Sequence, residues 1–104
     1  MREIDDLIEE IRDFAIRRDW ETFHTPRNLT LALVGEVGEL AAELQWKSSD
    51  DIRSMTPDEK SRIRLEVADI FIYLMRFSDV MDIDIVSAIR EKLRVNEERF
   101  PPTR

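Results

Sequence analysis

The segment from Pro57 to about Met81 is apolar on nearly all of its helical surface, and this feature most limits the fold. At about 100° per residue, its apolar side chains form two opposite stripes, made by Ile63, Val67, Ile70, Leu74 and Phe77 and by Leu65, Ala68, Ile72 and Met75. The main interruption is a narrow polar strip of Arg62, Glu66, Asp69, Tyr73 and Arg76. A helix that is apolar all round is a buried element, so we expect other helices to cover it on both sides.

Three further segments have helical periodicity or helical start signals. The sequence predicts helices over residues 3–18, 26–47 and 57–81, and a fourth that begins after Asp82 or Asp84 and ends before Pro101. Thr25-Pro26 and Thr56-Pro57 are typical of an N-cap followed by proline in the first turn, and Glu59 completes a capping box with Thr56. With only 2 Gly and 4 Pro in 104 residues, a turn-rich all-β fold is disfavoured. We therefore expect one all-α domain of four helices over residues 1–104, and the composition suits a helical oligomer because the core of a single subunit would be thin.

Charge and composition exclude several classes of function. The formal net charge of −7 does not offer the basic surface of a nucleic-acid-binding protein. The absence of cysteine excludes disulfides, thiolate zinc sites and cysteine catalysis. No apolar run approaches the roughly 20 residues that span a bilayer, and the acidic amphipathic start is unlike a targeting peptide. We expect a cytoplasmic protein that does not bind membranes or nucleic acid.

Two acidic pairs stand out on the two central helices. Glu36 and Glu39 have the same angular offset from their apolar stripe as Glu66 and Asp69 have from theirs, so antiparallel packing would bring the pairs together. No Lys or Arg lies three or four residues from Glu36 or Glu39, and burying such a cluster without a counterion is costly. The strip therefore either faces water, as acidic runs usually do, or holds a cation.

The ligand chemistry favours a hard cation. Carboxylate oxygens suit Mg²⁺, with Mn²⁺ as a possible substitute, and Mg²⁺ commonly binds a few carboxylates together with substrate phosphates. A di-iron bundle would need Glu-x-x-His motifs, but the only histidine, His24, lies outside both acidic motifs. The two glycines, Gly35 and Gly38, surround Glu36, and we interpret them as a site of close helix packing, within the chain or across a dimer.

The motifs GEVGELAAELQW and EVADIFIYL resemble those of the MazG-like all-α nucleoside triphosphate pyrophosphohydrolases. The segments DWETFHTPRNLTLALVGEVGELAAELQWKS and KLRVNEERFP are similar to the dCTP pyrophosphatase branch of that family. The family pattern has a further acidic residue where this chain has Gly35, which leaves open whether Glu43 assists.

The resemblance implies a four-helix bundle that assembles as a dimer or a dimer of dimers. It also implies the reaction NTP + H₂O → NMP + PPi on dCTP or a modified dCTP. It implies that Glu36, Glu39, Glu66 and Asp69 are metal ligands, and we nominate Glu36 or Glu39 as the catalytic base. The alternative, from a different class, is a non-catalytic helical module whose acidic strips bind a basic partner. Mg²⁺ and nucleotide should raise the melting temperature of the enzyme but not that of the module.

Eight other residues are candidates for binding the substrate, and each could instead have a purely structural role. Aromatic side chains that could stack on a base, or pack in a core or an interface, are Trp20 and Trp46. Polar side chains that could contact phosphate or base, or serve only as structural or solvated groups, are His24, Lys47, Tyr73, Lys92, Asn96 and Arg99.

Overall fold

A computed structural model describes residues 2–103 of the chain, and every regular element in this part is helical. The elements in chain order are α1 (Arg2–Ile16), the 3₁₀ helix η1 (Glu21–Phe23), α2 (Pro26–Leu44), α3 (Ser49–Arg53), α4 (Pro57–Val80) and α5 (Ile85–Arg99). The predicted all-α class and the positions of the four long helices are confirmed. No helix within residues 2–103 is long and apolar enough to cross a membrane.

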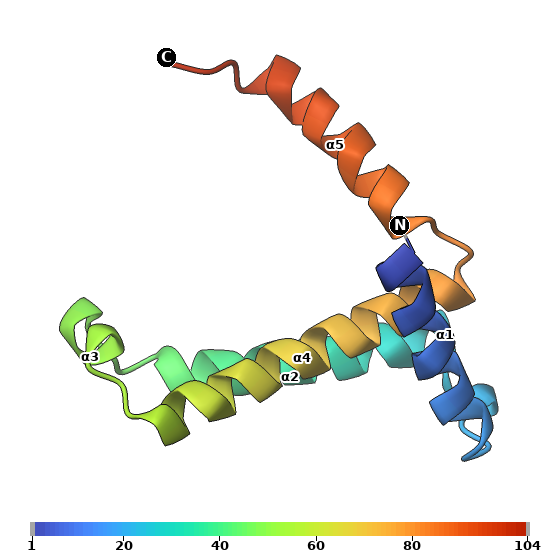
Figure 1. Ribbon diagram of the computed structural model, residues 1–104, viewed down its shortest axis with the longest axis horizontal. Coiled ribbons are helices and arrows are strands. Elements are labelled where there is room, and N and C mark those ends of the chain that lie inside the picture. Colours follow the sequence, from blue (N-terminus) through green and yellow to red (C-terminus); the bar gives the residue numbers. More distant parts are fainter. Residues whose placement is uncertain (1, 104) are drawn as a thin grey trace.

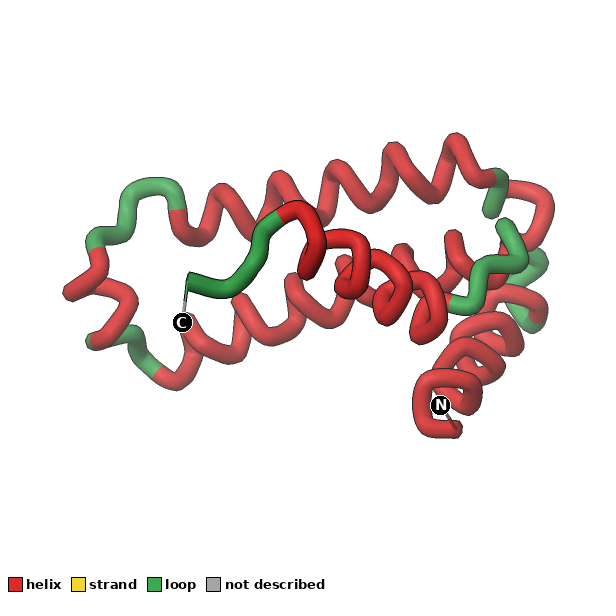
Figure 2. The backbone as a smooth tube through the Cα atoms, turned by 90° about the horizontal axis from the view of Figure 1, so that it is seen from above, coloured by secondary structure: helices red, strands yellow, loops and turns green. Residues whose placement is uncertain are grey.

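The centre of the molecule is a hairpin of α2 and α4. Figures 1 and 2 both show the two helices side by side and antiparallel, with the short helix α3 in the connection at one end. This is the arrangement that the angular positions of the two acidic pairs require. The hairpin therefore positions the candidate site.

Helix α1 crosses the opposite end of the hairpin, near the start of α2 and the end of α4 (Figure 1). Ala15 of α1 and Leu29 of α2 are each 2% exposed and are the fully covered apolar residues of residues 2–103. Arg12 of α1 donates two hydrogen bonds to Asp79 of α4, from Nε at 2.8 Å and from Nη2 at 2.7 Å. A bidentate guanidinium–carboxylate pair has a defined geometry, so it sets how α1 lies on α4.

Side-chain caps begin the helices where the sequence predicts them. The Thr25 hydroxyl accepts from the backbone N–H of Asn28 at 3.1 Å. Thr56 and Glu59 form the expected capping box, and Asp84, one of the two candidates for the last cap, caps α5. Each such cap satisfies an N–H that the helix itself leaves unpaired.

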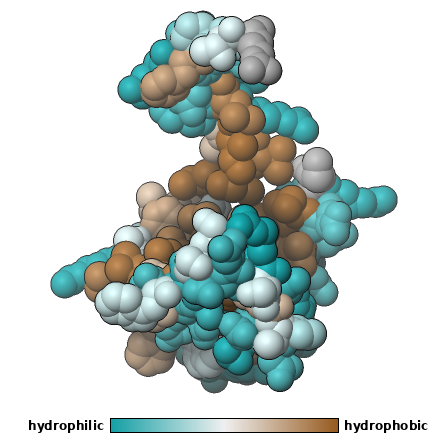
Figure 3. Space-filling model, turned by 90° about the vertical axis from the view of Figure 1, so that its left-hand side faces the viewer, coloured by the Kyte–Doolittle hydropathy of each residue, from teal (hydrophilic) through white to brown (hydrophobic). Residues whose placement is uncertain are grey.

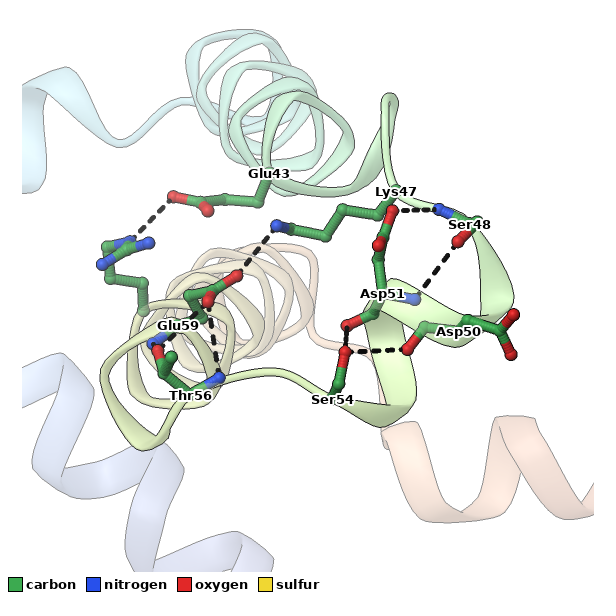
Figure 4. Close-up of polar contacts among 9 residues, drawn as sticks. Glu43, Lys47, Ser48, Asp50, Asp51, Ser54, Thr56 and Glu59 are labelled. Atoms are coloured by element: carbon green, nitrogen blue, oxygen red, sulfur yellow. Dashed lines mark hydrogen bonds and ion pairs between the residues drawn. The ribbon is translucent and has the colours of Figure 1, made fainter.

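The short helix α3 is absent from the sequence prediction. Ser48 and Asp51 form a second capping box at its start, in the polar stretch between the helices predicted over residues 26–47 and 57–81 (Figure 4). Its 5 residues are too few for a hydrophobic period to be recognised.

Helix α5 does not pack on the hairpin. It overlaps the hairpin in Figure 2, but Figure 1 shows it projecting away after the turn at its start. In that turn Asp82 adopts a left-handed backbone conformation with φ 57°, which redirects the chain. The expected four-helix bundle is therefore not closed within one chain.

The outer faces of α2 and α4 are open. Leu31 and Val34 of α2 are 60% and 64% exposed, and Leu65 and Phe71 of α4 are 54% and 53% exposed. Figure 3 shows apolar side chains open to the surface between α5 at the top and the hairpin below. The expectation that α4 is covered on both sides is thus wrong for the single chain, since Leu65 and Ile72 of its second stripe are 54% and 44% exposed.

The glycines have the same open surroundings. A Cβ built on Gly35 or Gly38 would meet nothing within 4 Å. Close packing at these positions, if it occurs, is therefore not packing within the chain.

Candidate active site

Three carboxylates from the two hairpin helices converge on one point. One oxygen each of Glu36, Glu39 and Glu66 can be chosen so that all three lie within 4.8 Å of one another. Glu36 and Glu66 are half-buried and Glu39 is exposed, so the cluster lies at the rim of the hairpin, open on one side. The predicted convergence of the two acidic motifs is confirmed for these three residues.

Two of these carboxylates have an oxygen that nothing satisfies. Oε2 of Glu36 and Oε2 of Glu66 are buried without a hydrogen-bond partner among residues 2–103. Buried polar atoms are nearly always paired, because an unpaired one loses its hydration without compensation. A cation at this point would satisfy both oxygens, and a set of carboxylate oxygens suits Mg²⁺ or Mn²⁺.

The electrostatics agree with that assignment. Burial, followed by the charges of Glu39 and Asp69, raises the pKa of Glu36. Burial and the adjacent carboxylate of Glu39 raise the pKa of Glu66 as well. Neighbouring carboxylates with raised pKa values repel one another when both are ionised. A divalent cation between them offsets this repulsion and stabilises the ionised forms.

Asp69, the fourth predicted ligand, lies near the cluster but outside the group of three. Its charge acts on both Glu36 and Glu66, which places it close to them. Its exposed side chain also lines a neighbouring cavity. Asp69 therefore stands between the carboxylates and that cavity.

The cavity beyond Asp69 has a volume of about 540 Å³ and is mainly apolar and aromatic. Its walls come from α1, from the η1 segment and from α4: Ile11, Phe14, Ala15, Trp20, Phe23, His24, Asp69, Ile72, Tyr73 and Arg76. We call it the aromatic pocket. It contains three of the predicted substrate-binding residues, Trp20, His24 and Tyr73. The rings of Trp20 and Phe14 pack edge to face with their centroids 5.7 Å apart.

A buried arginine that was not among the predicted site residues forms hydrogen bonds in one wall of this pocket. Arg76, 7% exposed, donates from Nε to Nδ1 of His24 at 3.0 Å and from Nη1 to Asp79 at 3.0 Å. His24 is thus a hydrogen-bonded structural histidine that also lines the pocket. The available signal was the position of Arg76 one turn beyond Tyr73 on the polar strip, but its partner lies 52 residues away in the sequence.

Lys47 is engaged in an ion pair with Glu59 at 2.8 Å, as Figure 4 shows. This pair and the hydrogen bonds from Thr56 lower the pKa of Glu59 to about 2. Glu43 faces Arg62 at 3.4 Å while lining a further cavity with Glu39 and Glu66. Within the chain Lys47 ties the end of α2 to the start of α4.

The remaining predicted residues are not brought to the cluster. Trp46, 87% exposed, follows the end of α2, whereas Trp20 precedes its start. The 19 residues of α2 span roughly 28 Å at the usual helical rise, so the two rings of one chain do not stack on the same base. Lys92, Asn96 and Arg99 lie on α5, which projects away from the hairpin (Figure 1).

Comparisons with known proteins agree with the geometry of the site. Residues 24–103 match the family model described as the MazG nucleotide pyrophosphohydrolase domain. The chain is similar to dCTP pyrophosphatase 1 of Mus musculus, with 43% identity over 100 residues, and to that of Homo sapiens, with 42% identity. These alignments cover 90% of this chain, which spans 59% of the length of the curated relatives.

The fold also matches a solved structure. A pyrophosphatase from Archaeoglobus fulgidus DSM 4304, determined by crystallography, is similar with a TM-score of 0.89 and 34% identity. The match covers 96% of this chain and 94% of that one. The chain belongs to the MazG nucleotide pyrophosphohydrolase family.

Proposed function

We propose that this protein is an Mg²⁺-dependent nucleoside triphosphate pyrophosphohydrolase that converts dCTP, or a modified dCTP, to the monophosphate and pyrophosphate. The observation that carries the proposal is the convergence of Glu36, Glu39 and Glu66, with two buried carboxylate oxygens that have no partner. Membership of the MazG family and the similarity to proteins named dCTP pyrophosphatase 1 support it.

Glu36, Glu39 and Glu66 would hold the metal, and Asp69 would complete the set from its position beside them. A divalent cation there supplies charge neutralisation for the triphosphate and activation of the attacking water. Mg²⁺ is the expected ion because it commonly shares its coordination between protein carboxylates and phosphates. Mn²⁺ is the expected substitute.

The attacking water needs a proton acceptor close to the scissile bond. Glu36 and Glu39 are the candidates, because both belong to the carboxylate cluster that would hold the cation. A carboxylate oxygen that the cation leaves free would accept the proton.

The aromatic pocket would take the base. Asp69 lies both near the carboxylate cluster and in the wall of the pocket, so a nucleotide could place its phosphates at the cluster and its base against Trp20 and Tyr73. Stacking on an aromatic side chain suits any base, so selection of cytosine requires polar groups as well.

A second copy of the chain is the expected partner. The outer faces of α2 and α4 and the projecting α5 expose more apolar surface than a stable monomer normally does. Assembly as a homodimer or a homotetramer would cover them. Trp46, Lys92, Asn96 and Arg99 would then reach the nucleotide in the site of a neighbouring copy, since their own site lies too far away.

Pyrophosphate release from a panel of nucleoside triphosphates tests the proposal. We expect turnover of dCTP with Mg²⁺, its loss in EDTA, and its loss in Glu36→Gln protein that retains the helical circular dichroism of the parent. Full activity in EDTA, or hydrolysis to the diphosphate and phosphate, would refute it.

A further inference from the structure

The carboxylate cluster opens on two sides that differ in chemistry. Beyond Asp69, towards α1, lies the aromatic pocket, whose walls are mainly apolar. Towards α3 lies a second cavity of about 380 Å³, lined by Glu39, Ala42, Glu43 and Glu66. We call it the acidic cavity. It shares Glu39 and Glu66 with the cluster, so a ligand that is bound at the cluster can extend directly into it.

Charge decides which of the two sides suits a polyphosphate. Ionised phosphate groups are costly to place against apolar side chains, so the aromatic pocket is a poor site for them. The acidic cavity is polar and open to solvent, but its carboxylates repel an anion. A divalent cation at the cluster offsets only part of the combined negative charge of a triphosphate and these carboxylates. A triphosphate in the acidic cavity therefore requires a further positive group from the protein.

Arg62 is a cation placed beside this cavity. Its Nε lies 3.4 Å from Oε1 of Glu43, which lines the cavity from α2. Arg62 also precedes Glu66 by one turn of α4, and residues four apart lie side by side on a helix. The ion pair and the helical register therefore both place the guanidinium next to the acidic cavity.

The ion pair with Glu43 leaves Arg62 available to a ligand. Lys47, whose charge also acts on Glu43, is held by Glu59 at 2.8 Å, with both side chains half-buried. The distance from Arg62 to Glu43 is longer, and the Arg62 side chain is 56% exposed. Exposed ion pairs contribute little to stability, so Arg62 can exchange a carboxylate for another oxyanion at small cost.

We propose that Arg62 binds the β- and γ-phosphates of the nucleotide in the acidic cavity, where its guanidinium leaves Glu43 for phosphate oxygens. This rests on the proposed function, because it places the group that departs as pyrophosphate beside the metal cluster. A planar guanidinium offers parallel N–H donors that match two phosphate oxygens at once. A nucleoside monophosphate lacks both of these phosphates. Arg62 therefore distinguishes the triphosphate substrate from the product that keeps the base.

Calorimetric titration in excess Mg²⁺ tests this contact without turnover. The probes are inorganic pyrophosphate and dCMP. We expect Arg62→Ala protein to bind pyrophosphate about tenfold more weakly than the parent and to bind dCMP as the parent does. Arg64→Ala is the matched control, since Arg64 is exposed on the other side of α4. A parent that does not bind pyrophosphate, an unchanged affinity in Arg62→Ala, or equal losses for both probes would overturn the proposal.

Substitution of Glu43 separates a phosphate contact from a structural ion pair. Glu43→Gln releases Arg62 and removes a repelling charge, so pyrophosphate should bind more tightly, by at most about fivefold, whereas Arg62→Ala weakens its binding. Both variants should melt close to the parent, because the ion pair is exposed. If the pair served only to hold α2 against α4, both variants would weaken pyrophosphate binding, and that result would overturn the proposal.

The double variant shows whether Arg62 acts on the phosphates or only on Glu43. In the Glu43→Gln background, Arg62→Ala should still weaken pyrophosphate binding about tenfold, because the lost contact is with the ligand. A loss that disappears in this background would mean that Arg62 merely neutralises Glu43, and the proposal would be wrong. Turnover of dCTP is a separate measurement. A parent that binds pyrophosphate through Arg62 but does not cleave dCTP would refute the proposed function and support the phosphate contact.

Discussion

Glu36 and Glu66 lie on neighbouring antiparallel helices, and the Oε2 atom of each is buried where no donor of residues 2–103 reaches it. Two like charges in this position oppose folding unless something positive lies between them. The pair therefore supports the proposed cation site, and it predicts how the stability of the protein should respond to Mg²⁺ and to EDTA.

Glu66→Gln should have opposite effects with and without metal. In EDTA we expect a higher melting temperature than that of the parent, because one of the repelling charges is gone. With Mg²⁺ at about a hundred times its Kd, the parent should gain roughly 2.7 kcal/mol and the variant much less. Thermal unfolding in both buffers checks this, with Glu98→Gln as the control, since Glu98 is an exposed carboxylate on α5, which projects away from the cluster.

Trp20→Ala should weaken nucleotide binding more than it slows the reaction. Loss of a base-stacking side chain costs about 1–3 kcal/mol, so KM for dCTP should rise roughly tenfold or more, with a smaller change in kcat. Steady-state kinetics of pyrophosphate release measure both constants. Trp20→Phe keeps a ring in the pocket and should recover much of the loss. An unchanged KM in the alanine variant would place the base elsewhere.

Oligomers that contain two different inactive variants should show activity that neither variant has alone. Glu36→Gln chains lack a complete carboxylate cluster, and chains with both Lys92→Ala and Asn96→Ala lack the proposed contacts from α5. Refolded together, they should form some sites that contain an intact cluster and an intact α5 from different copies. Activity that stays absent, although light scattering shows mixed oligomers, would mean that α5 does not reach a neighbouring site.

Val34→Asp should prevent association of the subunits. Val34 is 64% exposed on the outer face of α2, where a charge costs little in a monomer and much in a buried interface. We expect a smaller mass in light scattering and a lower melting temperature. Val34→Ile, which keeps the apolar character, should behave as the parent does. A monomeric parent protein would contradict the expectation of a dimer or tetramer.

The ion pair of Lys47 and Glu59 should contribute stability at neutral pH and lose it in acid. The pKa of Glu59 falls from its ordinary value of 4.5 to about 2 in the folded chain, so the folded state releases this proton more readily than the unfolded state does. The contribution is thus fully present above pH 4.5 and disappears as the pH falls towards 2.

Glu59→Gln isolates this effect, because glutamine can still complete the capping box with Thr56. The variant should have a lower melting temperature than the parent at neutral pH, and this difference should disappear in acid. Melting curves across the pH range measure it. A gap that persists at the lowest pH would mean that packing, and not charge, accounts for the difference.

Local signals in the sequence predict the four long helices well. Thr25, Thr56 and Asp84 cap helices where polar and proline residues indicate a start, and these interactions span only three residues. The acidic cluster was predictable for the same reason, since helical geometry alone aligns Glu36 with Glu39 and places both on the side that Glu66 shares.

Contacts between distant parts of the chain could not be read in this way. The hydrogen bond from Arg76 to His24 joins residues that are 52 apart in the sequence. The ion pair of Lys47 with Glu59 forms only because the connection through α3 brings the start of α4 beside the end of α2. The direction of α5 depends on a turn in which Asp82 has a positive φ. No glycine stands at this position to indicate such a turn in the sequence. Periodicity also could not tell which apolar stripe of α4 is covered by its own chain.

The projecting α5 has a consequence for newly made chains. A chain without a partner subunit exposes Ile89 and Leu93 of α5 and Phe100 directly after it, each by more than half, because α5 does not pack on the hairpin of its own chain. Surfaces of this kind are what chaperones and proteases act on in the cell. A chain that stays unassembled should therefore be degraded faster than one whose α5 is covered by a partner.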